Sequence, residues 1–500
     1  MAARGILILN FGSQYTQLIA RRIRELGVYS EILPAGITAK EIEKRQPYGI
    51  ILSGGPASVY DENAPKIDVR IFELEVPILG ICYGMQLIAQ HFGGEVTRGK
   101  IMEYGRTEIE LLTSDVLFEG LPKKFVVWMS HGDEVRKVPD FEILARSNVI
   151  AAIKLGRIYG IQFHPEVAHT EFGKQILANF VFKICNAERN WSMKNFVKAK
   201  VKELRRTIQG KAIAAVSGGI DSLVAALLVK QAIGENLKCV LVDHGLFREK
   251  EVDEVINTLS KLIHIEVVDA SGVFLRRLSG VIDPERKRRI TGETFAEILK
   301  WEAEKFGAKY LVQGTIYPDV VESGVGSDKI KTHHNVGGLP KDIGLEVVEP
   351  LRYLFKDEVR EIAKQLDVPK EILRRHPFPG PGLAVRVVGE VTKERLKTLR
   401  QADAILVEEL KKASLYDKVW QAFTILLPTR SVGVKGDRRS YGETIVLRII
   451  ESMDGMTADW AKLPYDFLQK VANRITNEVE GVTRVLYDIT SKPPATIEWE

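Results

Sequence analysis

Short apolar runs alternate with helical patterns along most of this chain, and this alternation limits the folds that it can adopt. In the first part of the chain, runs typical of strands cover residues 6–9, 49–52, 77–79, 125–129 and 157–163. Apolar residues at helical spacing cover residues 16–26 and 85–92. Strands that alternate with helices favour a parallel sheet with helices on its faces, because parallel neighbours need a crossover connection. The sequence therefore predicts an α/β fold in which a mostly parallel sheet is doubly wound.

The alternation resumes after a basic helical stretch at residues 194–209, whose charges we interpret as the solvated face of a linking helix. Further apolar runs predict a second doubly wound sheet, at residues 211–216, 239–242, 265–268 and 310–313. A segment dense in Pro and Gly, either a linker or a rigid loop, follows at residues 376–382. Beyond it helices and strands are mixed, which indicates a small α+β domain. We therefore expect three domains, at residues 1–190, 191–385 and 386–500.

The composition excludes several classes of protein. Three cysteines in 500 residues do not make a disulfide framework, so the chain fits a reducing compartment. No apolar run approaches the roughly 20 residues that a membrane span needs, and the first run is too short for the core of a signal peptide. A net charge of +5 on this length does not indicate nucleic acid. The sequence predicts a cytoplasmic protein with no membrane partner and no nucleic-acid partner.

A cysteine occupies a tight turn between a predicted strand and a predicted helix. Residues 80–84 read Gly-Ile-Cys-Tyr-Gly, which is the G-x-C-x-G form of a nucleophile elbow. The two glycines permit a turn that is too sharp for larger side chains. The partial positive charge of the helix N-terminus favours the thiolate form of Cys82.

A nucleophilic thiolate also needs a base that a third group orients. His164 ends a predicted strand and Glu166 follows two residues later, so the carboxylate can orient the imidazole. The backbone N–H groups of Gly55 and Tyr83 are placed to form an oxyanion hole. The alternative is a buried thiol and a core histidine. A single motif leaves that alternative open, but three motifs at three strand ends favour catalysis.

These segments together resemble the class I glutamine amidotransferase domain over nearly all of residues 5–185. The resemblance implies that Cys82 is the nucleophile, His164 the base and Glu166 the group that orients it. It also implies that glutamine is bound by Gln86, Ser130, His131 and Gly132. Cys185 lies outside every motif, and we assign it to packing.

A second glycine-rich turn joins a strand to a helix at residues 217–222, which read Ser-Gly-Gly-Ile-Asp-Ser. Such a turn presents backbone N–H groups to an anion, and the helix dipole adds to the attraction. An aspartate would repel phosphate, and a bound Mg²⁺ between Asp221 and the phosphate would remove the conflict. The turn is not a Walker A motif. The sequence predicts a phosphate site with Asp221 as a Mg²⁺ ligand.

This turn resembles the SGG-x-D-S loop of ATP pyrophosphatases, which release AMP and pyrophosphate. The next strand ends at Val242 and Asp243, where doubly wound sheets bind their ligands, and it would meet the adenosine half of ATP. His244 follows, and an ordinary loop histidine stays an alternative there. The residues predicted to bind ATP are Ser217, Gly218, Gly219, Ile220, Asp221, Ser222, Val242 and Asp243.

Residue chemistry alone indicates that amide nitrogen passes to an acceptor activated by ATP. Longer blocks of the chain resemble glutamine-hydrolysing GMP synthetases, at residues 11–15, 313–319, 331–340, 378–383 and 492–500. One departure is Asn10, where that family usually has Asp, and it can change how the following loop is held. The resemblance implies a ligase with glutamine as nitrogen donor, which adenylates xanthosine monophosphate (XMP) with ATP as co-substrate and converts it to GMP in purine biosynthesis.

The resemblance also implies that the chain is a homodimer joined through its C-terminal domain. It implies that XMP is bound by Arg288, Asp437, Lys492 and Glu498. Without the resemblance, the basic run at residues 285–289 would be interpreted as a solvated helix start. His333 and His334 invite a metal interpretation, but adjacent histidines diverge and no further ligand completes a Zn²⁺ set. Two alternatives stay open: an amidotransferase or thiolase with another acceptor, including tRNA, and a degenerate nucleotide-binding regulator.

Overall fold

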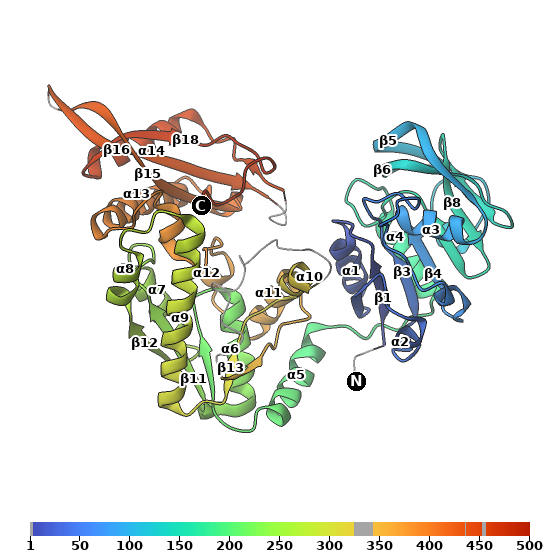
Figure 1. The fold of residues 1–500 in the computed structure, drawn as a ribbon, viewed down its shortest axis with the longest axis horizontal. Coiled ribbons are helices and arrows are strands. Elements are labelled where there is room, and N and C mark those ends of the chain that lie inside the picture. The colour runs from blue at the N-terminus through green and yellow to red at the C-terminus, as the bar shows by residue number, and fades with distance from the viewer. Residues whose placement is uncertain (1–3, 325–343, 436, 453–456) are drawn as a thin grey trace. The chain divides into compact units, whose positions relative to one another are not determined.

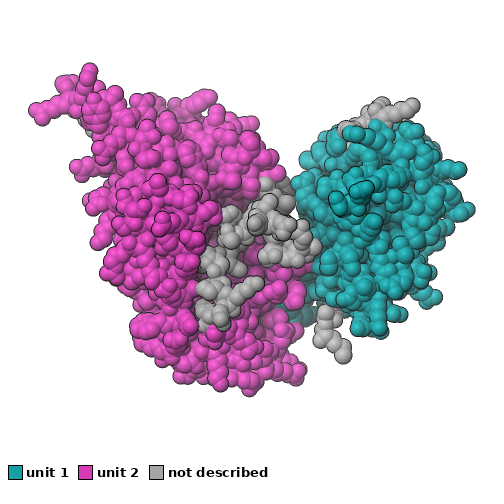
Figure 2. All heavy atoms as spheres, in the orientation of Figure 1, with its two compact units in different colours: residues 1–196 teal, residues 197–500 magenta. Residues whose placement is uncertain are grey.

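The structure is a computed structural model that describes residues 4–324, 344–435, 437–452 and 457–500. The chain forms two compact units, at residues 1–196 (unit 1) and 197–500 (unit 2), which Figure 2 shows in different colours. The block at residues 331–340, with His333 and His334, lies outside the described residues.

Unit 1 is built on a nine-stranded sheet in the order β2-β1-β3-β4-β9-β8-β7-β5-β6. Its parallel half consists of β2 (Ser30–Pro34), β1 (Ile6–Asn10), β3 (Gly49–Leu52), β4 (Ile78–Ile81) and β9 (Ile158–Ile161). The other half is antiparallel and consists of β8 (Ile150–Leu155), β7 (Glu142–Arg146), β5 (Glu95–Leu111) and β6 (Lys124–Lys137). The α/β class is confirmed, and the sheet is mixed where the sequence predicted a mostly parallel one.

Strands β1, β3, β4 and β9 of the parallel half are buried on both faces, as their largely apolar sequences require. The helices of unit 1 are α1 (Thr16–Glu25), α2 (Ala39–Glu43), α3 (Tyr83–His91) and α4 (Gly173–Ala178), seen in blue and green in Figure 1. All but the last two residues of α3 are buried, and this helix lies close to β3, β4 and β9. The carboxyl ends of these three strands therefore meet the N-terminus of α3.

Unit 2 begins in α5 (Met193–Thr207), the predicted linking helix, and contains a parallel five-stranded sheet in the order β12-β11-β10-β13-β14. The strands are β12 (Ile265–Asp269), β11 (Leu237–Asp243), β10 (Ala212–Ala215), β13 (Tyr310–Val312) and β14 (Glu346–Val348). The first strand in the sequence, β10, lies between β11 and β13. The chain passes from β10 outward to β11 and β12, and then returns to the other side of β10 to form β13 and β14. The order of the strands therefore reverses beside β10, and this is the switch point where such sheets bind ligands. The predicted second doubly wound sheet is confirmed.

Helices surround this sheet, with α6 (Ile220–Ile233) running directly from β10 and α7 (Glu251–Leu259) following β11. The others are α8 (Ser271–Leu278), α9 (Pro284–Phe306), α10 (Tyr317–Gly324), α11 (Lys356–Gln365) and α12 (Lys370–Leu373). None of the helices in the described ranges is long and apolar enough to cross a membrane.

The last part of unit 2 is a mixed sheet of β15 (Gln421–Lys435), β16 (Arg438–Glu451), β17 (Asp459–Trp460) and β18 (Val482–Tyr487), with helices α13 (Lys393–Lys412) and α14 (Tyr465–Glu478). One continuous apolar core runs from Ile213 and Val240 in the parallel sheet to Leu399 in α13 and Ile445 in β16. The two parts of unit 2 therefore share a core. Figure 1 shows the end of the β15–β16 hairpin projecting beyond the rest of this unit.

Candidate active sites

Cys82 lies at the junction of β4 and α3 with a strained backbone, at φ 51° and ψ −105°. This conformation is uncommon for a residue with a side chain, and such strain is concentrated at functional sites. The flanking glycines make the junction possible. A Cβ at Gly84 would lie 2.4 Å from the carbonyl oxygen of Leu52, and a Cβ at Gly80 would lie 2.5 Å from the carbonyl carbon of Gly84. The predicted nucleophile elbow is therefore present, and it holds Cys82 where the parallel strand β4 ends.

His164 and Glu166 are buried together, with 2.8 Å between Nδ1 of the imidazole and Oε1 of the carboxylate. The imidazole also forms a hydrogen bond with Cys82. Burial alone lowers the pKa of His164, but the charge of Glu166 and the hydrogen bonds to Cys82 and Glu166 raise it well above its usual value. A protonated imidazole beside a thiol favours the thiolate. The structure thus brings together Cys82, His164 and Glu166, which the sequence predicted as nucleophile, base and orienting group.

The segments predicted to bind glutamine surround the cysteine. Gln86, in the first turn of α3, donates from Nε2 to the carbonyl oxygen of Asp133 at 3.0 Å. His131 Nδ1 lies 3.0 Å from the same oxygen, and Cys82 Sγ lies 3.7 Å from the carbonyl oxygen of Ser130. Ser130, His131 and Gly132 lie in β6. A polar edge of β6 therefore lies next to the nucleophile, as a bound amino acid would need.

The sequence analysis gave no role to several residues that contact Cys82, His164 or Glu166 in the structure. Arg22 in α1 donates to the carbonyl oxygen of Glu166 at 3.0 Å, and Thr170 Oγ1 donates to that of His164 at 2.6 Å. The ring of Tyr15 meets His164 edge-on, with 5.1 Å between ring centroids. Tyr15 belongs to a block that the family resemblance marked without a role. Arg22 and Thr170 have no local signal, because folding alone brings them to the triad.

Asn10 holds its loop as an aspartate would at this position. Its Oδ1 accepts hydrogen bonds from the Gly12 N–H at 2.9 Å and from Thr16 Oγ1 at 3.0 Å. An amide oxygen, like a carboxylate oxygen, has the lone pairs to accept both bonds, although bonds to a carboxylate are stronger. The departure from the family pattern therefore preserves how the loop is held.

The second predicted site lies at the switch point, where β10 ends and α6 begins after Gly219. Gly218 has φ 80°, a left-handed conformation that suits glycine. Ser222 Oγ accepts the Ser217 N–H at 3.3 Å and donates to the carbonyl oxygen of Gly219 at 3.1 Å. A Cβ at Gly314, after β13, would lie 2.7 Å from the Ser222 nitrogen. The loop is a compact turn at a helix N-terminus, the geometry that binds phosphate.

Two basic residues that the sequence did not reveal contact this loop. Lys356 Nζ lies 2.5 Å from Asp221 Oδ2. Arg375 donates to the carbonyl oxygen of Gly218 at 3.3 Å and pairs with Glu251 at 3.0 Å. Both come from beyond residue 350, so only the fold shows the contact. Lys356 offsets the charge of Asp221, which the sequence had led us to assign to Mg²⁺ alone.

The residues present still fit a magnesium ion. Asp221 Oδ1 is buried and has no hydrogen-bond partner among the described residues, while Oδ2 is held by Lys356. An oxygen of this kind is a ligand that Mg²⁺ prefers, together with phosphate oxygens of a bound substrate. No group of three or more His, Cys, Asp or Glu side chains that could hold a metal is present in the described ranges.

The strand β11 ends at Val242 and Asp243, as predicted, and Asp243 Oδ1 accepts the Gly245 N–H at 2.9 Å. His244 is buried, accepts the Leu246 N–H on Nδ1 at 3.0 Å, and stacks on Phe247. Burial, with a contribution from the charge of Arg400, lowers the pKa of His244 to about 3. His244 is therefore a neutral histidine that shapes the loop after β11.

Three of the four residues predicted to bind XMP lie in the C-terminal segment, residues 490–500, or contact it. Several interactions hold this segment in place. Glu498 forms a bidentate ion pair with the buried Arg386 at 2.8 and 3.0 Å, and Lys492 pairs by backbone with Ala458. Arg288 donates to the carbonyl oxygen of Glu500. The segment is therefore no frayed tail.

Two further buried cations hold the same segment. Lys287 Nζ lies 2.5 Å from Glu500 Oε2, and burial lowers its pKa although Glu500 opposes the effect. Arg448 donates to the carbonyl oxygens of Thr490 and Thr496 at 2.6 and 2.9 Å.

Asp437, the fourth residue predicted to bind XMP, does not lie near the other three. It lies exposed in the turn of the β15–β16 hairpin with φ 60°. Gln421, at the opposite end of β15, donates to Glu498 at 3.0 Å. The 15 residues from Gln421 to Lys435 span roughly 40 Å or more at about 3.3 Å per residue. One chain therefore cannot place Asp437 and Glu498 on the same nucleotide.

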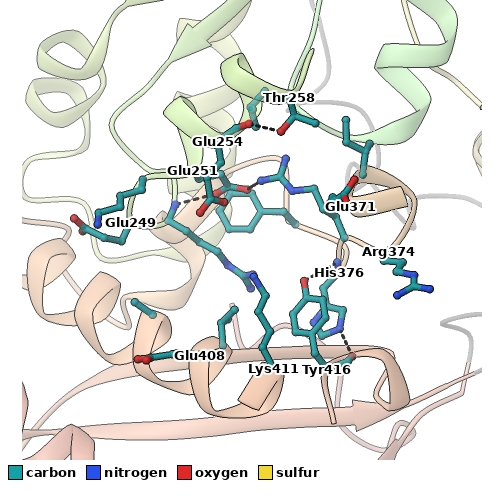
Figure 3. A pocket seen from close by; sticks show the side chains of 18 of the residues that line it. Glu249, Glu251, Glu254, Thr258, Glu371, Arg374, His376, Glu408, Lys411 and Tyr416 are labelled. Carbon is teal, nitrogen blue, oxygen red and sulfur yellow. Dashed lines mark hydrogen bonds and ion pairs between the residues drawn. The ribbon is translucent and has the colours of Figure 1, made fainter. Parts of the chain in front are cut away.

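A cavity of about 800 Å³ lies in unit 2 between α7, α12 and α13, and Figure 3 shows the side chains that line it. None of the residues described along its wall belongs to the predicted sites. Some of its charges pair with each other, through Arg248 and Asp403 at 3.0 Å and through Arg374 and Asp417 at 3.1 Å. More of the described lining side chains are acidic than basic, so this cavity is a poor place for an anionic substrate.

A cysteine elbow on one α/β unit and a phosphate loop on a second one define a glutamine amidotransferase of class I joined to a nucleotide-activating unit. The model of "Glutamine amidotransferase class-I" matches residues 7–184, and that of the "GMP synthase C terminal domain" matches residues 408–499. The chain belongs to the family of glutamine-hydrolysing GMP synthases, because full-length relatives share more than half of its residues.

Two of these relatives are named GMP synthase [glutamine-hydrolyzing]. The protein of Aquifex aeolicus is 59% identical, with all of both chains covered. The protein of Caldanaerobacter subterraneus is 56% identical, with 99% of each covered. A crystal structure of a glutamine amidotransferase from Thermotoga maritima is 21% identical and covers 41% of this chain and 86% of its own, with a TM-score of 0.28. That score is too low to support an argument about the fold.

The raised pKa of His164 leads to a prediction about Glu166→Gln. This change keeps the shape of the side chain but removes the charge that opposes burial, so His164 will lose its proton at a lower pH. We expect alkylation of Cys82 by iodoacetamide at pH 7 to slow by about tenfold, the equivalent of one pKa unit. Glu171→Gln is the matched control, because Glu171 accepts a bond from the Val126 N–H and does not contact the triad. An unchanged rate in Glu166→Gln would show that Glu166 does not set the charge of His164.

Proposed function

We propose that this chain synthesises GMP from XMP, ATP and glutamine, and that the two sites described above carry out the two halves of the reaction. The observation that supports this most directly is the buried arrangement of Cys82, His164 and Glu166 on a strained elbow. Family membership supplies the acceptor, XMP, in preference to tRNA or another acceptor. An intact triad also argues against a degenerate regulator. The cytoplasmic location stays a prediction.

In the first half-reaction Cys82 releases ammonia from glutamine. The thiolate attacks the carboxamide carbon, a C–S bond forms, and the C=O electron pair moves to the oxygen. The N–H groups of Gly55 and Tyr83 stabilise that oxyanion. His164 then gives its proton to the leaving nitrogen, and later takes one from the water that hydrolyses the thioester. The products are ammonia and glutamate.

Comparing glutamine with free ammonia as nitrogen source distinguishes the role of the Cys82 site from that of the phosphate loop. In Cys82→Ala we expect glutamine-dependent GMP formation to fall by at least about a thousandfold, as is typical when a nucleophile is lost. Ammonia-dependent formation should continue, because the phosphate loop is unchanged. The measurement is GMP formed from XMP and ATP with either nitrogen source. Cys185→Ala is the control, since burial raises the pKa of that thiol far above its usual value. Loss of both activities in Cys82→Ala would contradict the separation.

In the second half-reaction XMP is adenylated and then aminated. The XMP O2 oxygen attacks the α-phosphate of ATP, and pyrophosphate leaves into the loop of residues 217–222. Ammonia then attacks the C2 carbon of adenylyl-XMP, and AMP leaves. Backbone N–H groups of the loop, the α6 dipole, Lys356 and Arg375 favour the anions that collect here. A Mg²⁺ ion bound through Asp221 Oδ1 would neutralise phosphate charge further.

Asp221 is expected to serve both nitrogen sources. Removing its carboxylate in Asp221→Ala leaves Lys356 without its partner and removes the proposed Mg²⁺ ligand. We expect GMP formation from glutamine and from ammonia to fall together by about a hundredfold or more, the scale on which phosphoryl clamps act. Asp253→Ala, an exposed aspartate in the first turn of α7, is the matched control. Ammonia-dependent turnover within a few-fold of the unchanged chain would exclude this role for Asp221.

Asp437 leads to a proposal about the oligomer. Because it cannot reach the nucleotide bound near Glu498 of its own chain, its predicted contact with XMP requires a second copy. The hairpin that carries it exposes Val432, Val434 and Tyr441, at 49%, 73% and 68%. Val432 lies opposite Tyr441 in the ladder, so these side chains form one apolar face. We propose that this face joins two copies in a dimer, in which each hairpin extends toward the partner's nucleotide.

A charge in that face should separate the copies. We expect Val434→Asp to shift the mass in solution from dimer toward monomer and to raise the KM for XMP, because Asp437 would lose its place on the partner. The mass is measured by sedimentation, and the KM by ammonia-dependent synthesis. Tyr465→Asp, at an exposed position of α14, is the control. A dimer that persists in Val434→Asp would place the interface elsewhere.

A further inference from the structure

A buried serine controls the peptide unit that carries one of the two proposed oxyanion donors. We propose that Ser53 is a positioning residue that sets the orientation of the Gly54–Gly55 peptide and so aims the Gly55 N–H at the oxyanion. The inference rests on the proposed function of the Cys82 site and adds a residue to it. Ser53 touches neither substrate nor the reacting atoms in that proposal, and it acts only through the peptide.

Ser53 has no exposed surface and uses its hydroxyl in two directions. Its Oγ donates to the carbonyl oxygen of Gly54 at 2.8 Å and accepts the Phe11 N–H at 3.0 Å. Its own N–H donates to the carbonyl oxygen of Leu9 at 3.1 Å. A hydroxyl has one hydrogen to donate, so the bond from Phe11 leaves that hydrogen for Gly54. The hydroxyl is therefore fixed on both sides in the interior of unit 1.

The geometry of the peptide bond transmits this constraint to Gly55. The peptide between Gly54 and Gly55 is planar, and in a trans peptide the C=O and the N–H point in opposite directions. Because Ser53 holds the Gly54 oxygen toward the interior, the Gly55 N–H points the other way. Gly54 is buried and Gly55 is half-buried, so this peptide lies where the interior of unit 1 meets its surface.

The first of the two glycines lies beside the catalytic pair. A Cβ at Gly54 would lie 3.1 Å from His164 Cε1 and 3.7 Å from Cys82 Cβ, so the backbone of Gly54 lies against both residues. A Cβ at Gly55 would lie 2.6 Å from the carbonyl oxygen of Phe11, so this position accepts only glycine. Two consecutive glycines rotate freely unless something holds them. The hydrogen bond from Ser53 supplies the restraint that their missing side chains cannot.

A restraint of this kind acts on the transition state more than on the bound substrate. The negative charge on the oxygen appears only while the C–S bond forms, and donors that are already aimed need no reorganisation at that moment. Losing the restraint should therefore lower kcat for the glutamine reaction and leave the KM for glutamine nearly unchanged.

The test is Ser53→Ala in the full chain, supplied with XMP and ATP. Removing an oxyanion donor outright costs about 10²–10³ in kcat, so freeing one to rotate should cost about 10- to 100-fold. We expect that loss in glutamine-dependent GMP formation, with the KM for glutamine within about threefold. Ammonia-dependent GMP formation should not change. Iodoacetamide should alkylate Cys82 at an unchanged rate, because alkylation forms no oxyanion and reports only on the thiolate and its access.

A second variant and a control complete the test. Ser53→Cys keeps a weak donor of similar size, so its kcat should lie between those of Ser53→Ala and the unchanged chain. Ser30→Ala is the matched control, since Ser30 is equally buried, donates to the carbonyl oxygen of Ala20 at 2.8 Å and lies in β2. It should keep the full glutamine-dependent kcat.

An unchanged kcat in Ser53→Ala would overturn the inference. The inference would also be overturned if Ser53→Ala slowed the alkylation of Cys82 by as large a factor as it lowered kcat. That pattern would report general disruption of the site. Failure of the proposed function is a different result, namely glutamine-dependent synthesis that survives in Cys82→Ala.

Discussion

The close approach of α3 to the ends of β3 and β4 is the constraint on which the chemistry of unit 1 depends. A Cβ at Gly84 would lie 2.4 Å from the Leu52 oxygen, so the helix can begin there only because that side chain is absent. The turn between strand and helix is then so short that Cys82 adopts φ 51°. The same approach brings Gly54, two residues after β3, close to Cys82, because a Cβ on Gly54 would lie 3.7 Å from Cys82 Cβ. Strain at one residue and the placement of its neighbours therefore have one cause.

Charge balance has the corresponding role in unit 2. The phosphate loop combines helix dipole and N–H groups, which attract anions, with a carboxylate, which repels them. Lys356 pairs with that carboxylate, and Arg375 donates to the carbonyl oxygen of Gly218 in the same loop. The loop can therefore receive a polyanion without first neutralising its own aspartate, while Asp221 Oδ1 stays available for a cation. Both cations come from the connection after β14, far from the loop in sequence.

How much could be read from the sequence depends on how local each signal is. The elbow at Cys82 and the loop at Ser217 each lie within six residues, and both were placed correctly between strand and helix. His164 and Glu166 are neighbours in the chain, so their pairing could be predicted. Arg22, Thr170, Lys356 and Arg375 could not, because each reaches its site through a tertiary contact with no pattern around it. The antiparallel half of the first sheet was missed for a similar reason, since apolar runs do not reveal strand direction. The sequence also gave no sign that Asp437 lies at the end of a long hairpin.

The core of unit 2 has a consequence for dividing this protein into pieces. Leucines of α13 and strand residues of β16 pack in one cluster with the strands of the parallel sheet. A fragment cut near residue 385 would leave each piece with a large apolar face in water, where it would aggregate. The chain divides into its two compact units near residue 196. Genetic exchange can therefore replace the ammonia-producing unit as a module, whereas the nucleotide-activating part and the sheet that follows it must be inherited together.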